Sequence, residues 1–216
     1  MQLLDFISWG QPSREDRNNM QNKNYLFDVL PDLQKWTPPQ NSSRATLEEL
    51  NQLVTYSKLT EGGERKRVFD SDLIPYINEL FTKNGVDADI ITDLTKTIAL
   101  DVLPVLTYLK YHFQRPRPAQ LAYYYELDFF PCFSKFVSSP SYPSGHSTMC
   151  LVIAEVLGTR YSPDFPGCFQ IMSDFSAEVA ESRLYMGVHY ASDNRFARQT
   201  AQAIINNREF RKKYGF

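Results

Sequence analysis

The fold is decided by the stretch Ile98-Ala-Leu-Asp-Val-Leu-Pro-Val-Leu-Thr-Tyr-Leu-Lys-Tyr-His-Phe-Gln-Arg-Pro-Arg-Pro118, an apolar run that ends in two prolines. It predicts the second half of a long helix that begins near Asp87 and ends at about Phe113, with a kink at Pro104. A residue that precedes proline is pushed out of the helical conformation, so the two closing prolines end the helix.

This run is too short and too polar to cross a membrane. A membrane helix needs about 18 consecutive apolar residues, and Asp101, Pro104 and Lys110 interrupt this one. Residues 1–8 have neither a basic segment nor a long apolar core, so they do not predict a secretory signal. The three cysteines lack Cys-x-x-Cys spacing, which favours a reducing compartment over disulfides or a zinc site. We therefore expect a soluble cytoplasmic protein.

Helical signals continue on both sides of the long helix, and no alternating strand pattern accompanies them. Further helices are expected near residues 46–58, 71–83, 144–159, 167–186 and 192–212. Thr46-Leu-Glu-Glu49 is a capping-box pattern that opens the first of these. Residues 119–142 are aromatic and are expected to be irregular. The fold class predicted is all-α, a single-domain helical bundle with the active site at helix ends.

The chain divides into two parts by composition. Residues 1–43 form a polar, irregular arm or wrapped extension, and residues 44–216 form the helical domain. The arm could reach a neighbouring subunit in a homo-oligomer. The 216 residues carry a formal net charge of −2, which predicts no attraction to nucleic acid or to an anionic membrane. Affinity for an anion must therefore come from a local cluster.

One candidate for anion binding is Pro143-Ser-Gly-His146, which precedes an apolar helical run. Ser144 is a good N-cap, so the first turn presents the backbone amides of Gly145 and His146 at the positive end of the helix dipole. Gly145 leaves room for an anion to approach the backbone closely. Alone, the pattern is equally typical of an ordinary capped helix.

A second candidate is the pair His189 and Asp193, four residues apart. A carboxylate that accepts a hydrogen bond from one ring nitrogen of a histidine leaves the other nitrogen with a lone pair that can attack an electrophile. Alone, such a pair is more often a surface hydrogen bond.

Cations complete the pattern. Lys110 lies on the last turn of the long helix, and Arg117 lies just beyond the end of that helix. Arg183 precedes His189 by six residues. Guanidinium groups bind phosphate oxygens in pairs and lysine adds a point charge, so the three predict a phosphate site. Arg115 competes with Arg117 for this role.

Two further features have open interpretations. His112 is interpreted as a packing residue, because it faces away from Lys110 on a helix. The tyrosines and phenylalanines of residues 119–142 either line a leaving-group pocket or fill the core under a long loop.

These residues resemble the signature of the acid phosphatase and vanadium haloperoxidase superfamily, which includes the type 2 phosphatidic acid phosphatases. The signature is Lys-x6-Arg-Pro, then Pro-Ser-Gly-His, then Ser-Arg-x5-His-x3-Asp, and every fixed position is present between Lys110 and Asp193. Within the superfamily the chain looks most like the soluble class A nonspecific acid phosphatases.

The resemblance implies a role for each residue. His189 would be the nucleophile that forms a phosphohistidine, with Asp193 as its orienter, and His146 the acid that protonates the leaving oxygen. The residues implied to bind phosphate are Lys110, Arg117, Ser144, Gly145 and Arg183. The substrate would be a small-molecule phosphate ester, with no metal or other cofactor. The family tends to continue with small residues after Asp193, whereas Asn194-Arg-Phe196 follows here.

Two alternatives share these residues. A vanadium-dependent haloperoxidase would hold vanadate as its cofactor in the same cradle, with His189 as axial ligand. The algal bromoperoxidases carry a further histidine seven residues before the one of Pro-Ser-Gly-His, and that position is Ser139 here, which favours the phosphatase. A protein that only binds anions would need neither a nucleophile nor an acid.

Overall fold

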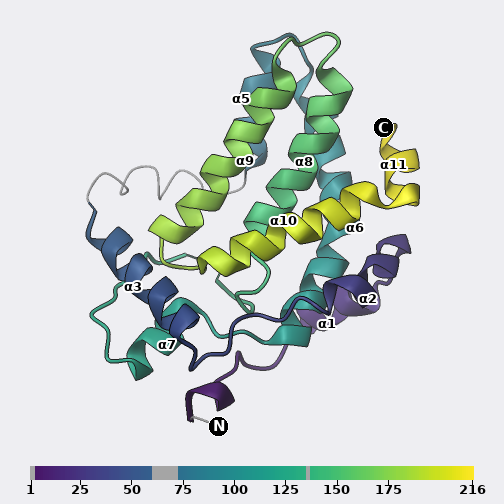
Figure 1. Cartoon of the computed structure of the whole chain (residues 1–216). Coiled ribbons are helices and arrows are strands. Elements are labelled where there is room, and N and C mark those ends of the chain that lie inside the picture. Colours follow the sequence, from purple (N-terminus) through teal and green to yellow (C-terminus); the bar gives the residue numbers. More distant parts are fainter. Residues whose placement is uncertain (1–2, 60–72, 135–136) are drawn as a thin grey trace.

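The computed structural model of the protein consists of helices joined by turns and loops (Figure 1). It describes residues 3–59, 73–134 and 137–216, and no strand occurs within these ranges. The α-helices are α1 (Arg14–Gln21), α2 (Leu30–Leu33), α3 (Arg44–Lys58), α5 (Ile74–Thr82), α6 (Ala88–Phe113), α7 (Pro118–Tyr124), α8 (Gly145–Tyr161), α9 (Cys168–Tyr185), α10 (Ala191–Asn206) and α11 (Arg208–Tyr214). Two short 3-10 helices, η1 (Leu3–Phe6) and η2 (Tyr25–Val29), accompany them. The predicted all-α fold is confirmed.

The body of the molecule is built around α8, which packs against α9 in an antiparallel pair and is crossed by α10 (Figure 1). The helix α6 packs beside α8, and both contribute buried side chains to the main core, with Val102 and Val156 among the fully buried ones. As a result, four helix ends meet at the lower end of the bundle: the C-termini of α6 and α9 and the N-termini of α8 and α10 (Figure 1).

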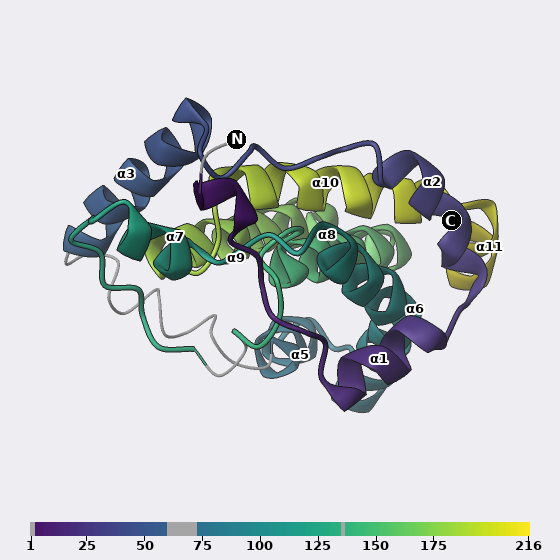
Figure 2. The same cartoon turned by 90° about the horizontal axis from the view of Figure 1, so that it is seen from below.

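Residues 3–43 wrap around this lower end and contain α1 and α2 (Figure 2). The sequence predicted an irregular polar arm here, but Leu26, Leu30 and Leu33 belong to the main core. The Tyr111 hydroxyl of α6 also donates a 2.8 Å hydrogen bond to Asp16 of α1. The segment is therefore packed onto the bundle, while the division of the chain at residue 43 stays a prediction.

The starts of two helices differ from those that the sequence predicted. Helix α3 begins at Arg44 because Ser43 caps it and accepts a hydrogen bond from the Thr46 amide at 3.2 Å. The capping box predicted at Thr46 is therefore wrong, and Glu49 is buried instead. The start predicted at residue 71 lies outside the described residues, and α5 is described from Ile74.

Three other expectations about helices are corrected or refined. The chain forms α7 at the start of the segment predicted to be irregular. The helix predicted over residues 192–212 is two helices, because Asn207 has an extended backbone and its side chain caps α11. Helix α6 runs through Pro104 as one element and ends at Gln114, which has a left-handed φ of 49°.

Among the residues that the structure describes, no helix combines the length and the apolar character that spanning a membrane requires.

Phe81 ties α5 to the core and gives a test of the packing. Its fully buried ring contacts Tyr161 and Phe165 edge-on, with ring centroids 5.2 and 5.9 Å apart. We expect Phe81→Ala to lower the free energy of unfolding by about 3–5 kcal/mol, because a cavity replaces the ring. Urea denaturation measures the loss. Phe130→Ala is the control, since that ring is 78% exposed and its loss is expected to change stability by less than about 0.5 kcal/mol.

Candidate active site

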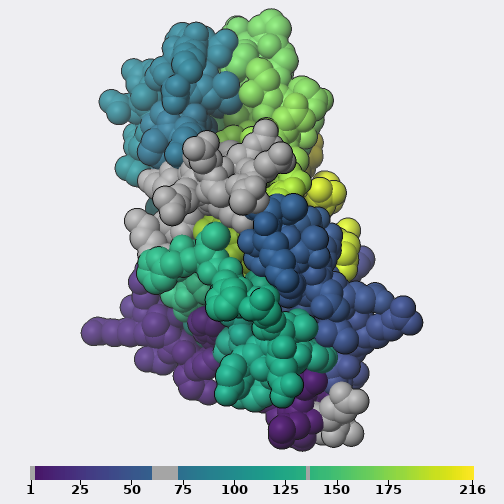
Figure 3. All heavy atoms as spheres, turned by 90° about the vertical axis from the view of Figure 1, so that its left-hand side faces the viewer, coloured from purple at the N-terminus to yellow at the C-terminus, as the bar shows by residue number. Residues whose placement is uncertain are grey.

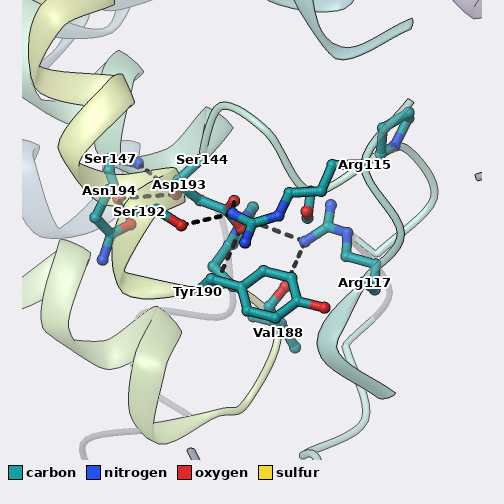
Figure 4. A network of polar contacts seen from close by, with 12 residues as sticks. Arg115, Arg117, Ser144, Ser147, Val188, Tyr190, Ser192, Asp193 and Asn194 are labelled. Carbon is teal, nitrogen blue, oxygen red and sulfur yellow. Dashed lines mark hydrogen bonds and ion pairs between the residues drawn. The ribbon is translucent and has the colours of Figure 1, made fainter. Parts of the chain in front are cut away.

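The eight residues predicted for the site come from separate segments and lie together where the four helix ends meet. Helix α6 supplies Lys110, the turn after it supplies Arg117, and the start of α8 supplies the Ser144–His146 segment. The end of α9 supplies Arg183, the turn before α10 supplies His189, and the first turn of α10 supplies Asp193. Part of their polar network is shown in Figure 4.

His189 is held from both sides of its ring. Its Nδ1 lies 3.0 Å from Oδ2 of Asp193, and its Nε2 lies 2.9 Å from Nη1 of Arg117. A guanidinium only donates hydrogen bonds, so Nε2 is the acceptor and the proton of the neutral ring is on Nδ1. The imidazole therefore presents a lone pair at Nε2, on the side of the cations.

Asp193 is completely buried and is surrounded by donors. Besides His189, the Tyr190 amide donates to its Oδ2 at 2.9 Å and Arg115 donates to its Oδ1 at 2.6 Å. Burial raises the pKa of the Asp193 carboxyl, whereas the Arg115 guanidinium and the Tyr190 amide lower it. Three donors converge on its two oxygens, which is the environment of a carboxylate.

The cations are anchored by backbone carbonyl groups. Lys110 donates from Nζ to the carbonyl of Pro140 at 2.7 Å. Arg117 donates to the carbonyls of Ser139 at 2.9 Å and Val188 at 2.7 Å (Figure 4). Burial and the charge of Arg117 lower the pKa of Lys110 well below its usual range. Fixed donors in a buried site are arranged before an anion arrives, so little reorganisation accompanies its binding.

The N-terminus of α8 lies against Lys110. A Cβ added at Gly145 would be 3.6 Å from Cε of Lys110. Ser144 caps the helix, and its hydroxyl lies 2.8 Å from that of Ser147, which donates to Asn194 of α10 at 2.9 Å. The first turn of a helix presents amides that the helix itself does not use, so this terminus adds positive potential beside the lysine.

The two histidines share one electrostatic environment. Burial, and after it the charges of Arg183, Lys110 and Arg117, together lower the pKa of His146 to about 3. Burial and the same three cations hold the pKa of His189 well below its ordinary value. Both rings are therefore neutral in the anion-free site at neutral pH.

Arg115 does not compete with Arg117 for the anion. Its guanidinium donates to Asp193 and to Ser192 Oγ at 2.6 Å (Figure 4). It also donates to Glu49 at 3.1 Å and lies 3.9 Å from the centre of the Tyr190 ring. Sequence reasoning left its role open and missed Glu49, because the carboxylate fitted a capping box. Only the helix face on which Glu49 lies could have indicated burial.

The three residues that depart from the family pattern after Asp193 all contact residues that surround the site. Asn194 bridges Ser147 of α8 and the carbonyl of Ala180 in α9. Arg195 donates to Glu49 at 3.3 Å, and Phe196 stacks on Tyr142 with ring centroids 4.3 Å apart.

Two features from the sequence lie away from the site. His112 is exposed and contacts Gln34 and Tyr108, which agrees with its interpretation as a packing residue. The aromatic segment lies on the surface shown in Figure 3, with Phe133 92% exposed and Tyr123 78% exposed. The exposed rings Tyr123, Tyr124, Phe130 and Phe133 do not fill the core, whereas Tyr142 belongs to the main core and Phe129 to a second core cluster. Phe129 is buried against Gly187, while residues 135–136 lie outside the described residues.

Within the described parts of the chain, no group of three or more His, Cys, Asp or Glu side chains is placed to hold a metal ion. The expectation that the protein needs no cofactor stays a prediction.

Comparison with known proteins identifies the family. The model of the PAP2 superfamily matches residues 91–204, a little over half of the chain. The chain belongs to the PAP2 superfamily. The matched region contains every residue of the cation and histidine cluster, whereas Glu49 lies before it.

A solved structure resembles this PAP2 protein over most of its length. The crystal structure of the first transmembrane PAP2 type phosphatidylglycerolphosphate phosphatase from Bacillus subtilis has a TM-score of 0.53 and 20% sequence identity, and the match covers 87% of this chain and 94% of that chain. At this identity the likeness supports the fold. No curated protein matches the sequence. The closer resemblance to soluble class A acid phosphatases stays a prediction.

The depressed pKa of His146 predicts that an anion brings a proton with it. A bound dianion cancels the effect of the three cations and raises the pKa of His146 from about 3. We expect sulfate, which does not itself titrate near neutrality, to bind with net proton uptake at pH 6 and more weakly as the pH rises. Calorimetry in buffers of different ionisation enthalpy measures the uptake.

His146→Ala is expected to reduce this uptake, leaving the share that belongs to Lys110, whose pKa is also lowered by burial. Sulfate binding with no proton uptake in the wild type would contradict the arrangement of charges described here.

Proposed function

We propose that this PAP2 protein is a metal-independent phosphomonoesterase that works through a phosphohistidine intermediate. The observation that carries the proposal is the state of His189: a neutral ring with its Nδ1 proton held by Asp193 and its Nε2 lone pair among buried cations. Such a nitrogen is a nucleophile, and the cations around it fit the oxygens of a phosphoryl group.

In the first step, Nε2 of His189 attacks phosphorus and the bond between phosphorus and the ester oxygen breaks. Lys110, Arg117 and Arg183 hold the non-bridging oxygens, and the amides at the start of α8 support them. Arg117 moves its Nη1 hydrogen bond from Nε2 to a phosphate oxygen. His146, protonated once the anion has bound, gives its proton to the leaving oxygen.

In the second step, His146 is neutral and acts as the base. It takes a proton from water, the water oxygen attacks phosphorus, and the bond between phosphorus and Nε2 breaks. Inorganic phosphate leaves, and His189 again carries its proton only on Nδ1. Asp193 stabilises the positive charge that the ring bears in the intermediate.

The direct test is hydrolysis of p-nitrophenyl phosphate by the purified protein in the presence of EDTA. We expect turnover that orthovanadate inhibits, because vanadate occupies the same cradle. Turnover that requires an added metal ion would contradict the metal-independent mechanism. Absence of turnover, together with oxidation of bromide by peroxide only after vanadate is added, would show a haloperoxidase instead.

The two histidines are expected to respond differently to substitution. His189→Ala removes the nucleophile and should lower kcat at least ~10³-fold. Its affinity for inorganic phosphate should stay within about tenfold of the wild-type affinity, because the cations remain. His146→Ala should slow alkyl phosphates far more than p-nitrophenyl phosphate, whose leaving group needs no proton. Steady-state kinetics on both esters measures these effects. Near wild-type rates for both variants would rule out the mechanism.

The choice of test substrates follows from the proposed phosphate site, in which Lys110, Arg117 and Arg183 contact the phosphoryl group and not the rest of the ester. The panel should contain nucleotides, sugar phosphates, pyrophosphate and a short-chain lipid phosphate, the last because the similar Bacillus subtilis protein is described as a phosphatidylglycerolphosphate phosphatase. The prediction of a soluble cytoplasmic protein stays a prediction, which cell fractionation checks.

A further inference from the structure

Glu49 of α3 is a buried carboxylate that points toward the site from outside the region matched by the family model. Its side chain is 10% exposed and lies on the buried face of α3 with Thr46, Leu50 and Leu53. It accepts hydrogen bonds from the Ser192 amide at 2.6 Å, the Ser192 hydroxyl at 2.7 Å, Arg115 at 3.1 Å and Arg195 at 3.3 Å.

A continuous path of hydrogen bonds joins Glu49 to the proposed nucleophile. Arg115 donates from Nη2 to Oε2 of Glu49 and from Nη1 to Oδ1 of Asp193. The other oxygen of Asp193, Oδ2, lies 3.0 Å from Nδ1 of His189. The guanidinium is therefore shared between two carboxylates, and only one of them contacts the histidine.

We propose that Glu49 is a positioning residue for His189, acting through Arg115 and Asp193. The inference rests on the proposed function and adds to it a residue of α3 that lies outside the three sequence motifs of the site. Glu49 does not touch the reacting atoms.

One physical effect supports this role. If Arg115 bound Asp193 alone, its positive charge would offset the negative charge that stabilises a positively charged His189. Because Arg115 also binds Glu49, its charge is shared between two carboxylates, and more of the charge of Asp193 acts on His189. Glu49 also accepts the Ser192 amide in the first turn of α10, next to Asp193, and the side-chain oxygen of Glu49→Gln can keep this contact, so that substitution removes only the effect of the charge.

The charged groups facing His189 make this balance important. Arg117, Lys110 and Arg183 all disfavour positive charge on the ring, as does His146 when it is protonated. Asp193 is the carboxylate that contacts the ring. A small change in how much of its charge is available to His189 therefore changes the stability of the phosphohistidine.

The test uses Glu49→Gln, which keeps the size of the side chain and removes its charge. We expect kcat for p-nitrophenyl phosphate to fall at least ~10-fold, with the inhibition constant of inorganic phosphate unchanged within about twofold, because the cations that bind the anion remain. The matched control is Glu48→Gln on the same helix, an exposed residue paired with Arg44, which should behave as wild type.

Coupling between Glu49 and Arg115 tests the path itself. If Glu49 acts through Arg115, the double variant Glu49→Gln/Arg115→Met should be no slower than Arg115→Met alone. Effects on kcat that multiply would overturn the proposal, and so would a loss of phosphate affinity with kcat unchanged. Thermal unfolding of each variant shows whether it is folded.

A spectroscopic measurement separates this inference from the proposed function. The Nδ1 proton of His189 should give a low-field proton resonance that disappears in Asp193→Asn. We expect Glu49→Gln to shift this resonance and Glu48→Gln to leave it in place. If the wild type hydrolyses no ester, the proposed function fails while the resonance still tests the path. An unshifted resonance in folded Glu49→Gln overturns the inference.

Discussion

The burial of positive charge is the constraint on which the rest of the structure depends. Lys110, Arg115, Arg117 and Arg183 are each less than a tenth exposed and lie within one region. An ionised group in a protein interior is costly unless it is paired and hydrogen-bonded. The chain meets this cost with the Asp193 and Glu49 carboxylates and with backbone carbonyls that accept from the lysine and from Arg117.

The architecture follows from that requirement. Carboxylates and carbonyls have to be supplied from several directions, so the site lies where α6, α8, α9 and α10 end and not on the face of one helix (Figure 1). The same burial keeps His146 and His189 neutral. A site with neutral histidines and an excess of fixed cations favours an anion over water.

Arg115 and Arg117 are two positions apart in the chain but bind different partners. A proline lies between them, and the chain is extended beyond the end of α6, so their side chains point to different partners. Arg117 faces His189, and Arg115 faces Asp193 and Glu49. From Glu49 through Arg115 to Asp193, which contacts His189, the charges therefore alternate in sign, and each group is stabilised by its neighbours.

The sequence by itself determined the all-α class, most helix positions and the residues that come together, because helical periodicity, caps and motif spacing are local properties. It did not determine α7, the break at Asn207 or the cap at Ser43, where neighbouring side chains compete for the same backbone groups. Only the tertiary structure decided that Glu49 is buried beside Ser192, 143 residues away. No local pattern can encode such a contact, because it depends on how α3 packs against the start of α10.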